Sequence, residues 1–236
     1  MEDVGSEALM VGDRASAAGL LVEDGPAHRL IVRGEGRYGE FFNAREHAAL
    51  PVRGLVSPLL SRMITVRGTW TGDAIVDAEV TDGGRGVEPP RRLKPTRLAE
   101  VDGFNNRSDI LRDDVLTACE TIRGGALVAF VAERGPRGWF GLASAVDTSR
   151  VQEVLGGLLG THLHIVPNPW SLDEIDAAQD AALDKVEPLQ FGYFWDDDGH
   201  FRAEMVVQHV SPALASVLAQ LPADILHVAT WLRREE

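Results

Sequence analysis

Cysteine is nearly absent from this chain of 236 residues, which contains only Cys119. An intrachain disulfide is therefore impossible, and this composition fits a reducing compartment. The sequence also lacks any apolar run of about 18 residues, the length that a membrane-spanning helix needs. Its first residues include acids where a secretory signal would have Lys or Arg. We therefore expect a cytoplasmic protein with no membrane segment.

The motifs of several enzyme classes are also missing. The sequence contains no G-x-S-x-G nucleophile turn, no Walker phosphate loop, no H-E-x-x-H zinc motif and no C-x-x-C pair. The run WDDDGH at residues 195–200 lacks the alternating acids and closing Glu of a calcium loop, and it indicates the tip of a hairpin. We expect no cofactor and assign no catalytic residue.

Positive charge is scarce in the second part of the chain. Residues 1–92 contain 11 Lys or Arg and 14 Asp or Glu, whereas residues 93–236 contain 12 and 22. The densest stretch, residues 173–198, has nine acids and one base. Such a surface repels nucleic-acid phosphates and attracts a basic protein. A solvated face that only promotes solubility is the alternative interpretation.

A segment rich in turn residues divides the chain. Residues 81–97, TDGGRGVEPPRRLKPTR, combine glycines, prolines and basic residues without apolar periodicity, a pattern typical of a linker. We predict a β domain at residues 1–82, a linker at 83–97 and an α+β domain at 98–236.

The first domain shows strand and turn patterns. Residues 18–34 and 63–80 each indicate a hairpin, with Gly68 at a bulge or bend. Over about residues 15–82 this pattern resembles a small OB-like barrel. OB barrels often bind oligonucleotides through stacking aromatics and a basic groove. This module is slightly acidic and its strands offer essentially Trp70, so we expect no nucleic-acid partner.

The second domain shows a repeated order of elements. Residues 108–170 and 171–232 each have the patterns of helix, strand, strand, helix and strand. A shift of 63 residues places His164 on His227, which indicates an internal duplication. With a possible first strand at residues 97–104, the first copy has the ferredoxin-like order βαββαβ. The predicted fold class is α+β, a small OB-like β-barrel followed by a duplicated αββαβ domain.

Local signals predict several details of this domain. Ser108 is the expected cap of the first helix, and Ser171 with Glu174 forms an expected capping box. Cys119 lies on an apolar helical stripe and is interpreted as a core residue. The strands expected to be best buried are ALVAFVA (126–132), THLHIV (161–166), MVVQH (205–209) and ILHVATW (225–231).

His162 and His164 form the clearest candidate for a metal site. Alternation along a strand would place both imidazoles on one face, with Asp173 or Asp176 as the nearest third ligand. The second copy has Ile225 in place of His162, so a structural role in the sheet is the simpler interpretation. The alternative function is an enzyme or small-molecule sensor with a site between the two copies.

The leading hypothesis is a protein-binding or inhibitory module without catalytic activity, such as an immunity protein that neutralises a nuclease toxin by presenting acidic charge. A structural subunit of a larger assembly would have the same sequence features. Acids recur every three or four residues on the helix predicted from residue 172 to 186 and so share its outer face. The predicted residues for binding a basic protein partner are Asp173, Asp176, Asp180, Asp184, Asp196, Asp197 and Asp198. No feature of the sequence indicates an oligomeric state.

Overall fold

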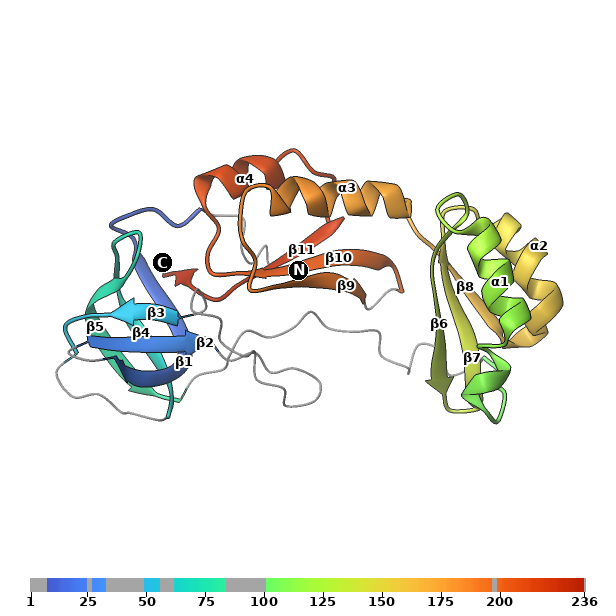
Figure 1. Cartoon of the computed structure of the whole chain (residues 1–236), viewed down its shortest axis with the longest axis horizontal. Coiled ribbons are helices and arrows are strands. Elements are labelled where there is room, and N and C mark those ends of the chain that lie inside the picture. Colours follow the sequence, from blue (N-terminus) through green and yellow to red (C-terminus); the bar gives the residue numbers. More distant parts are fainter. Residues whose placement is uncertain are drawn as a thin grey trace. The chain divides into compact units, whose positions relative to one another are not determined.

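The computed structural model of the chain describes residues 8–24, 27–32, 49–55, 62–83, 101–196 and 199–235. Within these residues the protein is a mixed α+β structure with several sheets and four α-helices (Figure 1). None of the described helices is long and apolar enough to span a bilayer. The predicted linker lies outside the described residues except for Gly83.

The chain forms two compact units, which are described separately. The first contains Met1–Pro90, Asp180–Gly192 and Glu204–Glu236, and the second contains Arg91–Gln179 and Tyr193–Ala203. The division passes through one helix and two strands of the C-terminal half. The boundaries 1–82 and 98–236 stay a prediction.

The N-terminal sheet confirms both expected hairpins. Its strands are β1 (Arg14–Asp24), β2 (Ala27–Val32), β3 (Ala49–Val52), β4 (Met63–Trp70), β5 (Ile75–Asp82) and β12 (Arg233–Arg234), in the order β12-β1-β2-β3-β5-β4. β1 pairs with β2, and β4 pairs with β5, both antiparallel. β1 also pairs with β4. The sequence did not predict β3, which joins β2 to β5.

Gly68 lies at an irregularity of β4, as predicted. The register between β4 and β5 shifts between Arg67 and Thr69. A Cβ atom on Gly68 would lie 2.5 Å from the carbonyl oxygen of Val76 and 2.5 Å from Ile75 Cγ2. Glycine is therefore required by the close approach of the neighbouring strand.

The end of the chain contributes to the core of this first unit. Trp231 and Leu232 are buried together with apolar residues of β1 to β5. The indole Nε1 of Trp231 donates a hydrogen bond to the carbonyl oxygen of Ala18 at 2.7 Å. Arg67 also forms an ion pair with Glu235 at 2.8 Å. The N-terminal sheet is thus covered in part by residues that are distant in the sequence.

The predicted element order occurs in residues 108–170. The elements are α1 (Asp113–Ile122), β6 (Leu127–Gly135), β7 (Gly138–Ala145), α2 (Thr148–Leu159) and β8 (Leu163–Pro167). β7 lies at the centre of the sheet, antiparallel to β6 and parallel to β8. Figure 1 shows α1 and α2 on one face of this sheet, and the apolar stripe containing Val115, Cys119 and Ile122 belongs to the core.

The same order occurs in residues 171–232. The elements are α3 (Leu172–Leu183), β9 (Gln190–Trp195), β10 (Phe201–Val207), α4 (Pro212–Leu218) and β11 (Leu226–Thr230). The sheet order is β11-β10-β9, again with the second strand at the centre. Each strand begins 63 positions after its counterpart in the first segment. Figure 1 shows α3 and α4 on one face of this sheet.

Two details differ from the sequence-based expectations, and a third is not confirmed. Ser108 lies in a 3-10 turn, η3 (Arg107–Asp109), and α1 begins only at Asp113, because Ile110 turns into the core between them. β8 and β11 are mostly half-buried, since they are edge strands, and the central strands β7 and β10 are better buried. The ferredoxin-like first strand is not confirmed. Of its described residues, Phe104 alone pairs, as a single bridge to Trp139.

Candidate functional site

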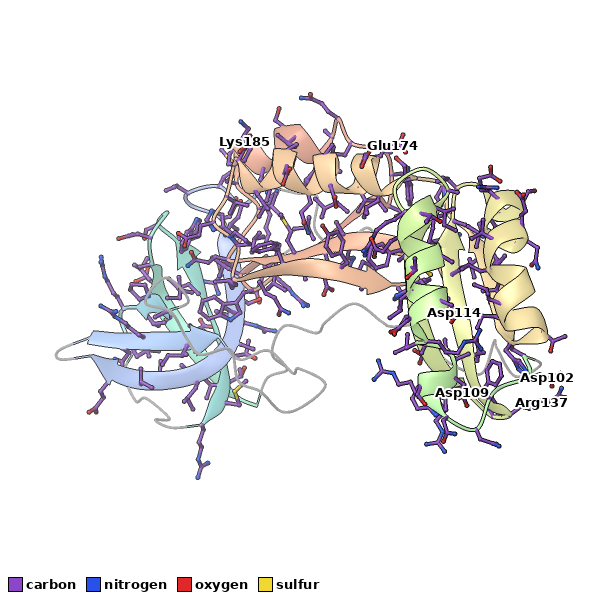
Figure 2. The ribbon with its side chains drawn as sticks, turned by 45° about the vertical axis from the view of Figure 1, so that its right-hand side comes forward. Asp102, Asp109, Asp114, Arg137, Glu174 and Lys185 are labelled. Carbon is purple, nitrogen blue, oxygen red and sulfur yellow. The ribbon has the colours of Figure 1, made fainter. Side chains whose placement is uncertain are left out.

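The acidic face of α3 is the first candidate site. Asp173 and Asp180 are exposed on this helix, and Asp184 is exposed just beyond its end. Asp176 is partly buried. Figure 2 shows Glu174 at the first turn of α3 and Lys185 beyond its last turn. The helix has no basic residue in its last turn.

The predicted capping box of this helix is confirmed. The backbone N–H of Ser171 donates to Glu174 Oε2 at 2.7 Å, and the Ser171 hydroxyl donates to the same oxygen at 2.8 Å. The backbone N–H of Glu174 donates back to Ser171 Oγ at 3.3 Å. The hydrogen bond from the Ser171 backbone is the main reason that the pKa of Glu174 is lowered. Glu174 therefore serves the helix end, where a negative charge is favourable.

Asp176 differs from its neighbours because it has a structural partner. Its Oδ1 accepts a hydrogen bond from the hydroxyl of Tyr193 on β9 at 2.7 Å. The Tyr193 ring stacks on Phe201 of β10, with centroids 5.3 Å apart and planes at 16°. Trp195 contacts the edge of the same Phe201 ring. Tyr193 nevertheless leaves 42% of its surface exposed.

Asp196, another predicted partner-binding residue, faces inward. Its side chain is 16% exposed and forms an ion pair with Arg202. It also accepts a hydrogen bond from the backbone N–H of His200 at 2.9 Å, and its Oδ2 lies 3.2 Å from His200 Nδ1. Arg202 in turn lies over the ring of Trp170, 5.1 Å from its centroid. Asp197 and Asp198, the other two predicted acids of this turn, lie outside the described residues.

A buried polar group joins the hairpin of β9 and β10 to the end of β8. The Oδ1 of Asn168, which directly follows β8, accepts a hydrogen bond from the backbone N–H of Phe201 at 3.0 Å. Its Nδ2 donates to the carbonyl oxygen of Trp170 at 2.6 Å. The fully buried hydroxyl of Ser144 also accepts from Phe201 N–H, at 3.3 Å. We call Asn168, Ser144 and Phe201 the polar clasp.

The two candidate metal ligands do not share a strand, which corrects the expectation that one strand would place both imidazoles on the same face. His162 ends a 3-10 turn, η4 (Gly160–His162), whereas His164 lies within β8. Within the described part of the chain, no group of three or more His, Cys, Asp or Glu residues is placed to hold a metal ion. Asp173 and Asp176 therefore do not complete a site with these histidines. Burial lowers the pKa of His164 and favours its neutral form.

His162 belongs to a packed junction. Its ring lies against Phe104, with centroids 3.9 Å apart. Phe104 exchanges two backbone hydrogen bonds with Trp139. Asp102 and Arg137 approach each other to 3.3 Å next to this junction (Figure 2). His162 thus takes part in an aromatic contact at this junction, and a structural role for it stays a prediction.

Sequence reasoning missed most residues of the polar clasp and its surroundings. Asn168 stands between a strand and a helix cap, where a polar residue is ordinary. Arg202 occupies one polar position in an alternating strand. Neither has a local pattern that separates it from a solvent-facing residue, because its partner comes from another element.

Comparison of the chain with protein-family models, curated proteins and solved structures finds no match.

Proposed function

We propose that this protein is a non-catalytic, cytosolic binding or inhibitory module that engages a basic protein through the outer face of α3. The observation that carries the proposal is that Asp173, Asp180 and Asp184 are all exposed, and no ion pair within the described part of the chain neutralises them. Most ion pairs among the described residues join an Asp or Glu to an Arg. The negative charges of these three aspartates are therefore available to attract a basic partner.

The position of these charges is unfavourable for the helix itself. Asp180 lies in the last turn and Asp184 just beyond it, where the helix dipole favours cations. The two are also four residues apart, a spacing at which like charges repel by a few tenths of a kcal/mol, roughly. Selection for stability does not explain acids at these positions, whereas attraction of a basic partner does.

The partner that fits this face is a protein with clustered Arg or Lys. An acidic face can occupy the nucleic-acid site of a nuclease-type toxin, which makes an immunity protein the most concrete form of the proposal. The N-terminal module supports protein rather than nucleic acid as the partner, because Trp70 is 2% exposed and does not offer a stacking surface.

The finer architecture is part of this proposal. We infer that the N-terminal sheet is OB-like, because β1 pairs with both β2 and β4 and the order continues through β3 and β5. We infer a duplication from the constant spacing of 63 residues between the strands of residues 108–170 and 171–232. In this arrangement α3 is the counterpart of α1.

The test compares the wild type with a variant in which Asp173, Asp180 and Asp184 are changed to Asn. Asp176 is left intact because it holds Tyr193. Captured proteins from the host are identified by mass spectrometry, and association rates with the recovered partner are then measured at low and high salt. We expect slower association for the variant at low salt, and a difference that shrinks as salt screens exposed charges beyond about 8 Å.

A control variant removes the same charge elsewhere, by Glu23→Gln, Asp77→Asn and Asp113→Asn, three exposed positions outside α3. We expect it to associate at nearly the wild-type rate. If the α3 variant and the control associate equally fast at low salt, the acidic face only promotes solubility and the proposal is wrong.

A further inference from the structure

Tyr193 presents an aromatic ring in a fixed orientation. One side of the ring is stacked on Phe201. The hydroxyl is held by its 2.7 Å hydrogen bond to Asp176. With 42% of its surface exposed, Tyr193 belongs to the few large apolar or aromatic side chains that reach solvent in the described structure. An exposed ring with both a stacking contact and a hydrogen bond is already ordered for binding.

This combination of ring and carboxylate suits a cation. The face of an aromatic ring attracts a cationic group, and the attraction is larger for a guanidinium that can stack flat on the ring. Asp176 uses one oxygen for the Tyr193 hydroxyl, but a carboxylate offers about four acceptor positions. A guanidinium on Tyr193 can therefore also donate to Asp176. Asp173 and Asp180 lie one helical turn before and after Asp176 and add to the negative potential.

We propose that Tyr193 and Asp176 form a subsite that binds one arginine side chain of a basic peptide segment. This inference rests on the proposed function, since it names the chemistry by which the acidic face recognises its partner. Arginine is favoured over lysine, because an ammonium does not stack on a ring and fork to a carboxylate at the same time. The subsite supplies specificity, whereas Asp173, Asp180 and Asp184 supply attraction at a distance.

The chain allows a direct test, because it contains two tyrosines, Tyr38 and Tyr193. Protein labelled with ¹³C only in tyrosine rings is titrated with the peptide acetyl-GRGRGRG-amide, and the ring signals are followed by NMR. The Tyr193→Phe variant assigns the signals, and Tyr38 is the internal reference. Two control peptides replace every arginine of this peptide by lysine or by the neutral analogue citrulline. We expect the Tyr193 signals to shift with the arginine peptide, to shift less with the lysine peptide, and not to shift with the citrulline peptide.

Variants then identify the groups that bind. Tyr193→Leu is expected to weaken binding of the arginine peptide about fivefold, in the range of a cation–π contact, and to remove the preference for arginine over lysine. Phe191→Leu is the matched control, because Phe191 is 57% exposed on the same strand, and we expect unchanged binding. Asp176→Asn is a second variant with the ring intact, and it is expected to reduce the arginine preference as well.

The outcomes separate this inference from the proposed function. If the α3 variant of Asp173, Asp180 and Asp184 weakens binding but Tyr193→Leu and Asp176→Asn do not, the acidic face binds and the arginine subsite is overturned. If Tyr193→Leu weakens binding and the α3 variant does not, the subsite is supported and the acidic-face proposal fails. If no variant weakens binding, both are overturned.

Discussion

Replacement of Asn168 by alanine should loosen the hairpin of β9 and β10 more than any exposed substitution of similar size. Asn168 is 6% exposed, and its side chain joins two backbone groups that come from different parts of the sequence. The amide oxygen accepts from Phe201 N–H at 3.0 Å, and the amide nitrogen donates to Trp170 O at 2.6 Å. The Asn168→Ala variant removes both hydrogen bonds, together with a longer one from the amide nitrogen to Phe201 O at 3.4 Å.

The expected cost follows mainly from the two shorter bonds. An intramolecular hydrogen bond contributes about 1 kcal/mol net, and a buried group left without a partner costs about 1–3 kcal/mol. Ser144 Oγ remains 3.3 Å from Phe201 N and limits the loss at that group. We therefore expect the local free energy of opening to fall by about 2–3 kcal/mol, which corresponds to roughly 30- to 150-fold faster amide exchange.

Hydrogen exchange of peptides that contain the amide of Phe201 measures this effect directly. Asn106→Ala is the matched control, because Asn106 is exposed and its side chain caps no helix, and we expect wild-type exchange. Asn168→Asp keeps an acceptor for Phe201 but places a carboxylate oxygen against Trp170 O, so it should exchange faster than wild type. Exchange at Phe201 that stays within threefold of wild type in Asn168→Ala would refute the role of the clasp.

Two further predictions concern titratable side chains. Burial raises the pKa of the Cys119 thiol to about 11, so a thiol reagent at pH 8 should label Cys119 only after denaturant is added. Burial next to Trp70 lowers the pKa of His209 below the usual value for a histidine, so the unfolded chain binds a proton at this site more readily than the folded one. Stability, measured as a thermal midpoint, should therefore decrease as pH falls below about 6.5, and the decrease should be smaller in His209→Gln.

Local signals predicted those elements that depend on neighbours in the sequence. The capping box at Ser171 and Glu174 needs only four consecutive residues, and it forms as expected. The hairpins of β1 with β2 and of β4 with β5 follow from strand patterns separated by short turns. The inward position of Cys119 follows from the helical stripe to which it belongs.

The elements that were not predicted depend on distant partners. β12 contains only Arg233 and Arg234, and these pair with β1 across nearly the whole chain. Asp196 looked like part of an exposed acidic turn, yet Arg202 and His200 surround its carboxylate. The burial of a charged residue follows from its partners in space, and a single sequence does not list those partners.

The duplication that we propose would make Asn168 and Trp231 equivalent positions. Asn168 directly follows β8, and Trp231 directly follows β11, 63 residues later. Both are buried, and both donate a side-chain N–H to a backbone carbonyl oxygen, Asn168 to Trp170 and Trp231 to Ala18. The small amide suits a polar clasp within the second unit, whereas the indole fills an apolar core within the first. In the proposed duplication, the different residues at this one position let equivalent strand ends attach to different neighbours.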